Sequence, residues 1–182
     1  MNTALPRREL LLALLGSSLP AAAQTQAVDV WAQVRPFLGQ WKGNSEGRPG
    51  RGTVERTYAF VLGGRYVQEL NVSIYPPQDK SPKGERHEHW SYFSYDRSRK
   101  LLMLRQFHVE GFINTYRQAA ATEATGALVF ESEAFENLPA GWQARESYQF
   151  PTPDEVIETF ELSSPGKPFE VYSRTTLSRQ RP

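Results

Sequence analysis

Alternation of apolar with polar residues, the pattern of a β-strand with one face on a core and the other in solvent, recurs in about ten short segments between turn signals. The connections between these segments are mostly two to nine residues long. Parallel strands need connections of about a dozen residues or more, so consecutive strands are expected to pair antiparallel as a meander. The expected strands cover residues 41–47, 53–61, 65–75, 85–95, 100–109, 112–120, 127–136, 142–150, 155–162 and 169–178.

A meander of this many strands predicts a closed barrel. Closure removes the unpaired strand edges that favour aggregation, and a barrel of about ten strands encloses more space than its own side chains fill. One short helix is expected near residues 28–36. We therefore predict an all-β fold, an antiparallel up-and-down barrel of about ten strands with a short N-terminal helix and an interior pocket.

The first 23 residues have the order of an export signal. The basic pair Arg7-Arg8 precedes an apolar run over residues 10–15 and then three consecutive alanines. This order fits either a general secretory signal or a twin-arginine signal. We expect a signal peptide over residues 1–23, a single barrel domain over residues 24–182, and a periplasmic or secreted location.

Charge and composition exclude several classes of partner. Removal of the signal takes Arg7 and Arg8 from 21 basic residues and Glu9 from 20 acidic ones, which leaves 19 of each. A net charge near zero without a basic block argues against a nucleic-acid partner, and no segment is apolar enough to predict a membrane-spanning helix. The chain has no cysteine, so disulfides and thiolate metal ligands are excluded.

Residues 37–43, Phe-Leu-Gly-Gln-Trp-Lys-Gly, follow the expected helix and open the first strand. Gly39 permits a tight turn into the strand, and Trp41 is placed to plug one end of the barrel. This start resembles the Gly-x-Trp start of the calycin superfamily, which contains lipocalins and fatty-acid-binding proteins. Calycins often stack a cationic side chain of the last strand on that ring. We expect Arg174 to fill this role, with Arg179 as the alternative.

Two further sequence segments indicate a particular group of barrels with this start. Ser94-Tyr95-Asp96 at a hairpin turn and residues 60–65, Phe-Val-Leu-Gly-Gly-Arg, look like the nitrobindin-like, haem-binding-like barrels and their exported bacterial relatives. That resemblance implies a hydrophobic cavity and, in the haem-binding members, an axial histidine from a late strand. No histidine follows His108, so haem is not carried over and no cofactor is assigned.

The turn at Glu110-Gly111 sets the register of the hairpin around it. A two-residue loop with glycine second suits a type I′ turn, which pairs Arg105 with Tyr116. This register puts six side chains on one face, and because that face is the more aromatic one we expect it to line the interior. These side chains belong to Arg105, Phe107, Val109, Phe112, Asn114 and Tyr116. A tight turn at residues 96–99 adds Trp90 beside Arg105.

Alternation on two later strands predicts further interior groups, among them Glu146, Tyr148 and Glu158. A buried guanidinium needs acceptors, so Arg105 is expected to meet Glu146 or Glu158. Two interpretations stay open: a polar anchor for a ligand within aromatic walls, or a structural network that fills the barrel. The predicted ligand-binding residues are Arg105, Asn114, Tyr116, Glu146, Tyr148, Glu158, Trp90 and Phe107.

A rival constellation consists of His87, His89 and His108. Alternate residues of one strand share a face, and imidazoles at that spacing can bind zinc or iron. The register that turns Arg105 inward turns these histidines outward, however, so no metal site is expected. A one-residue bulge at the turn over residues 96–99 would reverse the orientation of His87 and His89.

These features favour an exported protein that holds a small apolar or amphipathic molecule inside its barrel. One alternative is an enzyme in which a buried tyrosine and carboxylate, such as Tyr116 and Glu158, act as acid and base. The chain has no nucleophile elbow, phosphate loop or recognisable triad, which weighs against that alternative. The other alternative is a structural or interaction module without a ligand.

Overall fold

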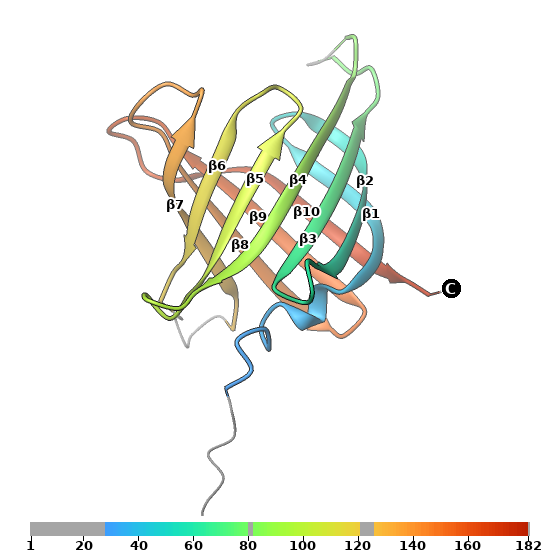
Figure 1. Cartoon of the computed structure of the whole chain (residues 1–182). Coiled ribbons are helices and arrows are strands. Elements are labelled where there is room, and N and C mark those ends of the chain that lie inside the picture. Colours follow the sequence, from blue (N-terminus) through green and yellow to red (C-terminus); the bar gives the residue numbers. More distant parts are fainter. Residues whose placement is uncertain (1–27, 80–81, 121–125, 182) are drawn as a thin grey trace, which may run out of the picture.

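The computed structural model describes residues 28–79, 82–120 and 126–181, which fold into a closed antiparallel barrel (Figure 1). Each strand pairs with its neighbours in sequence, and β1 pairs with β10 to close the sheet. This confirms the predicted up-and-down barrel; the predicted signal peptide over residues 1–23 lies outside the described residues. The strands are β1 (Gly39–Gly47), β2 (Gly50–Val61), β3 (Tyr66–Tyr75), β4 (Glu85–Asp96), β5 (Leu101–His108), β6 (Ile113–Gln118), β7 (Leu128–Glu136), β8 (Gln143–Thr152), β9 (Glu155–Ser163) and β10 (Glu170–Gln180).

The helix expected over residues 28–36 does not form. Residues 30–34 make turns, and a three-residue 3-10 helix, η1 (Arg35–Phe37), follows them. Gly39 starts β1 with a φ of +112°, which ends the segment directly after η1 and Leu38. Within the described residues, no helix has the length and apolar character needed to span a bilayer.

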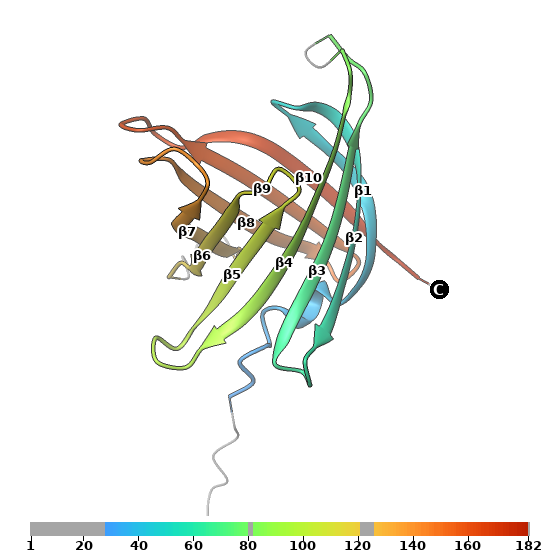
Figure 2. The ribbon, with the colours of Figure 1, turned by 45° about the horizontal axis from the view of Figure 1, so that its top comes forward.

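The two ends of the barrel differ in what covers them. The turns before β1 and the 3-10 helix η1 lie across the end where β1 begins, which we call the closed end (Figures 1 and 2). The phenyl ring of Phe37 is fully buried there and packs against Tyr58, Phe93, Tyr148 and Phe150, with ring centroids 4.8–5.8 Å apart. The opposite end, where β1 finishes, is the pocket end.

Trp41 plugs the closed end as predicted. Its ring is completely buried, and its indole N–H donates to the carbonyl oxygen of Phe37 at 2.6 Å. The cation on this ring belongs to Arg179, whose guanidinium carbon lies 4.2 Å from the ring centroid. The choice of Arg174 was wrong: Arg174 is exposed on the outer face, whereas Arg179 shares the inward face of β10 with Leu177.

The predicted register of the β5–β6 hairpin is wrong by one residue. Arg105 pairs with Thr115 instead of Tyr116. The loop has three residues rather than two, since the His108 N–H bonds to the Phe112 carbonyl oxygen at 3.1 Å. A type I′ turn needs a positive φ at both central residues, and of the two residues in the predicted loop only Gly111 has one.

This one-residue difference reverses the face on which the β5 side chains lie, because side chains alternate along a strand. Arg105 and Phe107 are exposed on the outer wall, and Trp90, which pairs with Phe107, is 55% exposed beside them. Gln106 faces the interior instead, together with His108. The predicted inward orientation of Arg105, Phe107 and Trp90 is therefore wrong.

Candidate functional site

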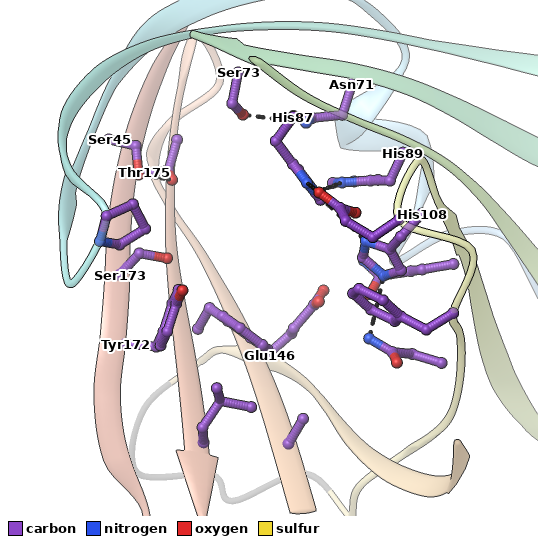
Figure 3. Close-up of a pocket in the computed structure, with 18 of the residues that line it drawn as sticks. Ser45, Asn71, Ser73, His87, His89, His108, Glu146, Tyr172, Ser173 and Thr175 are labelled. Carbon is purple, nitrogen blue, oxygen red and sulfur yellow. Dashed lines mark hydrogen bonds and ion pairs between the residues drawn. The ribbon is translucent and has the colours of Figure 1, made fainter. Parts of the chain in front are cut away.

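The pocket end of the barrel contains a cavity of about 500 Å³ (Figure 3). Its mouth is formed by partly exposed apolar side chains from the strand ends and from the β7–β8 loop. Its deeper wall is formed by buried polar side chains from the middle of the strands. The mouth includes Phe112, Phe135, Leu138, Trp142 and Phe160, and the deeper wall includes Arg56, Asn71, His89, Gln106, Asn114, Glu146 and Glu158.

Arg56 of β2 is the buried cation of this wall. Its guanidinium bonds to the Glu158 carboxylate of β9 and lies 3.3 Å from Oε1 of Glu69 on β3. Its Nε–H also donates to Oδ1 of Asn71 at 2.8 Å. The expectation of a buried arginine paired with Glu158 was therefore right about the carboxylate and wrong about the arginine, which is Arg56 rather than Arg105. Arg56 was detectable in the sequence, because it alternates with the apolar residues Val54 and Tyr58.

Two buried carboxyl groups, those of Glu69 and Glu146, have pKa values shifted in opposite directions. Burial by itself raises the pKa of Glu69, but the charge of Arg56 and the neighbouring His89 outweigh it and hold that pKa at about 2. Burial and the negative charge of Glu158 raise the pKa of Glu146 to about 8, although a hydrogen bond donated by Tyr148 opposes this shift. Glu69 is therefore ionised at neutral pH and Glu146 is mostly protonated.

Three histidines converge on one side of the cavity (Figure 3). His87 and His89 come from β4, and His108 comes from β5. Nε2 of His87 lies 3.4 Å from Nδ1 of His89 and 3.4 Å from Nδ1 of His108. The predicted outward orientation of the three histidines was wrong for the same reason as the inward orientation of Arg105.

Each imidazole has a polar neighbour on the side that faces away from the other two histidines. Nδ1 of His87 lies 2.8 Å from Oε1 of Glu110. Nε2 of His89 lies 3.5 Å from the Glu69 carboxylate, and Nε2 of His108 lies 3.2 Å from Nδ2 of Asn114. Burial, and then the two other histidines, lower the pKa of His108 to about 3, so this imidazole is neutral at physiological pH.

The structure brings five of the eight predicted ligand-binding residues to the interior. Asn114, Glu146 and Glu158 line the cavity. Tyr116 and Tyr148 are buried in the core beside it, and the Tyr148 hydroxyl reaches Glu146. Arg105, Trp90 and Phe107 lie on the outer wall, away from the cavity. Sequence reasoning missed Arg56 and Asn71 as cavity residues.

Of the two suggested acid–base residues, Glu158 lines the cavity, whereas Tyr116 lies in the core and is not part of the cavity lining. The Glu158 carboxylate is bonded to Arg56. The Tyr116 hydroxyl accepts a hydrogen bond from Asn114 at 3.0 Å, and burial raises the pKa of this tyrosine well above its usual value. The carboxyl group that exchanges a proton near neutral pH is Glu146.

The fold and the cavity define a closed ten-stranded barrel with a polar interior pocket, consistent with a calycin-like barrel. The crystal structure of Rv2717c from M. tuberculosis has a similar fold, with a TM-score of 0.60 over 85% of this chain and 99% of that chain. The sequences are 18% identical, so the likeness extends to the fold alone. No family model and no curated protein sequence matches the chain.

A haem site of the kind expected from nitrobindin-like barrels does not fit these residues. Such a site takes its axial histidine from a late strand. All three histidines of this chain lie on β4 and β5, and β9 and β10 contain none.

Proposed function

We propose that this protein is an exported barrel that binds a small amphipathic molecule in its pocket-end cavity. The observation that carries the proposal is a cavity of about 500 Å³ with an aromatic mouth and a protonated carboxyl group, that of Glu146, in its inner wall. Sites for small molecules enclose about 300–1,000 Å³ and combine apolar walls with a few polar groups that orient the ligand. The order of residues 1–23 supports the export part of the proposal.

Glu146 is not needed to neutralise the buried charge of Arg56. Arg56 already has two carboxylate partners, Glu69 and Glu158, so a third acidic residue adds nothing to its neutralisation. In the described part of the chain, Glu146 has no cation within ion-pair distance, and its hydrogen-bond partner is Tyr148. A buried carboxyl without a cation costs free energy unless it is protonated, which is the state that its raised pKa produces.

The charges of the inner wall indicate the chemistry of the ligand's polar end. One guanidinium faces two carboxylates, and the protonated Glu146 adds no charge, so the wall is net negative. A carboxylate or phosphate head group would be repelled there. A neutral or cationic head group with hydrogen-bonding atoms is compatible with the wall, and Glu146 can donate to it or, once ionised, pair with it.

The mouth of the cavity suits the apolar body of such a ligand. Phe112, Phe135 and Phe160 are partly buried, and the Trp142 side chain is 38% exposed. Aromatic rings at a pocket entrance contribute large apolar contact area when a ligand covers them. Membership in the nitrobindin-like or lipocalin-like barrels is part of this proposal, supported by the Gly39-x-Trp41 start and the shared fold of Rv2717c.

Two measurements test the proposal. Native mass spectrometry of the protein purified from the periplasm of its own host is expected to show a retained small molecule. In vitro, the neutral dye N-phenyl-1-naphthylamine is expected to bind with fluorescence enhancement, and its anionic sulfonate relative is expected to bind at least about tenfold more weakly, which corresponds to about 1.4 kcal/mol.

Matched variants locate the bound dye. Ala144→Phe adds a ring at a buried residue of the cavity wall and is expected to abolish dye binding, whereas Arg105→Met on the outer wall is expected to leave it unchanged. A barrel that retains no mass and binds neither dye would be a structural or interaction module instead. Equal binding of the two dyes would refute the charge argument while leaving ligand binding in place.

A further inference from the structure

We propose that His87, His89 and His108 bind a divalent transition-metal ion, whose remaining coordination positions face the cavity. The three histidines are not part of the charge argument for the ligand, which applies to the metal-free protein, so the two proposals can fail separately. It also reverses the expectation of no metal site, which depended on the wrong orientation of the histidines.

Two of the three nitrogen–nitrogen distances match those around a shared metal ion. Zinc–imidazole bonds of about 2.0–2.1 Å at tetrahedral angles place the ligand nitrogens about 3.3–3.4 Å from one another. Nε2 of His87 lies 3.4 Å from Nδ1 of His89 and 3.4 Å from Nδ1 of His108. One nitrogen from each of the three rings lies within 4.8 Å of a nitrogen of each of the other two rings.

The carboxylates beside His87 and His89 favour tautomers in which lone pairs of the two imidazoles point at one another. A neutral imidazole has one N–H group and one lone pair. The Glu110 carboxylate, 2.8 Å from Nδ1 of His87, takes the N–H of that ring and leaves a lone pair on Nε2. Nε2 of His89 lies 3.5 Å from the Glu69 carboxylate and has no hydrogen-bond partner among the described residues, so a small rotation of the ring would let its N–H donate to Glu69 and would leave the lone pair on Nδ1. In that tautomer two lone pairs would face each other across 3.4 Å, and a cation between them would remove their repulsion.

The outer neighbours are those that metal-bound histidines usually have. Such rings almost always donate their second N–H to a carboxylate or another acceptor, which fixes the tautomer and the ring orientation. Glu110 lies 2.8 Å from Nδ1 of His87 in this way, and Glu69 lies 3.5 Å from Nε2 of His89. Asn114 lies beside His108, and its Oδ1 is buried without a partner among the described residues. A half-turn of the amide would bring this oxygen to Nε2 of His108, and the Tyr116 hydroxyl would then donate to Asn114 instead of accepting from it.

The donor set also selects the class of ion. Three imidazoles suit zinc, iron, copper or nickel, whereas magnesium and calcium prefer oxygen ligands. A second group, Glu85 with His87 and Glu110, lies at the rim and offers mostly oxygen. It shares His87 and Glu110 with the proposed site, so Glu85 is the residue that distinguishes the two positions.

Calorimetric titration of the full chain with Zn²⁺ tests the proposal, using protein without a polyhistidine tag after treatment with a chelator. One equivalent is expected to bind, and Mg²⁺ is expected to give no signal. His89→Ala and His108→Ala are each expected to weaken zinc binding by more than about 100-fold, and Glu110→Gln by about 10- to 100-fold. The control variant Glu85→Gln is expected to bind zinc as the unmodified protein does.

Nitrogen NMR of the imidazoles gives a second readout that needs no variant, because the chain has three histidines in all. Zinc is expected to shift one nitrogen of each ring: Nε2 of His87, Nδ1 of His89 and Nδ1 of His108. Absence of stoichiometric zinc binding would overturn the proposal. So would zinc binding that Glu85→Gln weakens and His108→Ala leaves intact. Dye binding by the chelator-treated protein reports separately on the ligand-binding proposal.

Discussion

The closed end and the pocket end of this barrel are built from the same ten strands, yet they are held together by different forces. At the closed end, η1 covers the opening and aromatic rings pack around Phe37 and Trp41. At the pocket end nothing comparable fills the interior, and the inward positions are occupied by charged and polar groups such as Arg56 and Glu146. Close packing stabilises the first end. At the pocket end, buried polar groups bond to one another, and this allows the cavity to remain unfilled by side chains.

Substitution of one tryptophan at each end tests most directly whether the two ends are packed differently. Trp41→Ala removes a fully buried ring from the closed end, and the expected loss is about 3–5 kcal/mol in the free energy of unfolding. Trp142→Ala removes a partly exposed ring from the mouth of the pocket, with an expected loss below about 1 kcal/mol because solvent already reaches that ring. Urea denaturation measures both losses, and equal losses would show that the two ends are packed alike.

The second prediction concerns the charges at the pocket end. Arg56→Met leaves the Glu69 and Glu158 carboxylates buried without their cation, so the free energy of unfolding is expected to fall by about 3–5 kcal/mol. Arg105→Met is the matched control on the outer wall, where a change within about 0.5 kcal/mol is expected. A large loss in the Arg105 variant, with little in the Arg56 variant, would reverse the assignment of the inner and outer faces.

The smallest effect expected is a pH dependence due to Glu146. Its pKa is about 8 in the folded protein and near 4.5 otherwise, so between these values the folded state holds a proton that the unfolded state releases. Stability is therefore expected to fall as the pH rises through this window, by about 2 kcal/mol between pH 6 and pH 8. Glu146→Gln imitates the protonated form and should lack this loss, while every other titrating group is unchanged.

Denaturation of both proteins at the two pH values, with a chelator present, gives the comparison. Identical pH dependence in the two proteins would mean that Glu146 is ionised in the folded state. The net negative charge of the inner wall would then be larger, and a cationic ligand head group would be favoured over a neutral one.

Local patterns in the sequence were sufficient to predict the barrel. Alternation located all ten strands to within three residues at either end, and the short connections imposed antiparallel pairing. Gly39 and Trp41 identified the closed end, because the Gly-x-Trp pattern is contained within three consecutive residues, although the ring of Trp41 packs against the distant Phe150 and Arg179. Glu146 and Glu158 were assigned correctly to the interior, since each alternates with apolar residues on its own strand.

Only the tertiary structure decided which residues meet inside the barrel. The loop after His108 has three residues instead of two, and this single residue exchanged the inner and outer faces of β5, which put Arg105 outside and the histidines inside. Because side chains alternate with a period of exactly two residues, an error of one in the register inverts a whole strand. The pairing of Arg56 with Glu158, 102 residues away, depends on closure of the barrel, about which no local pattern carries information.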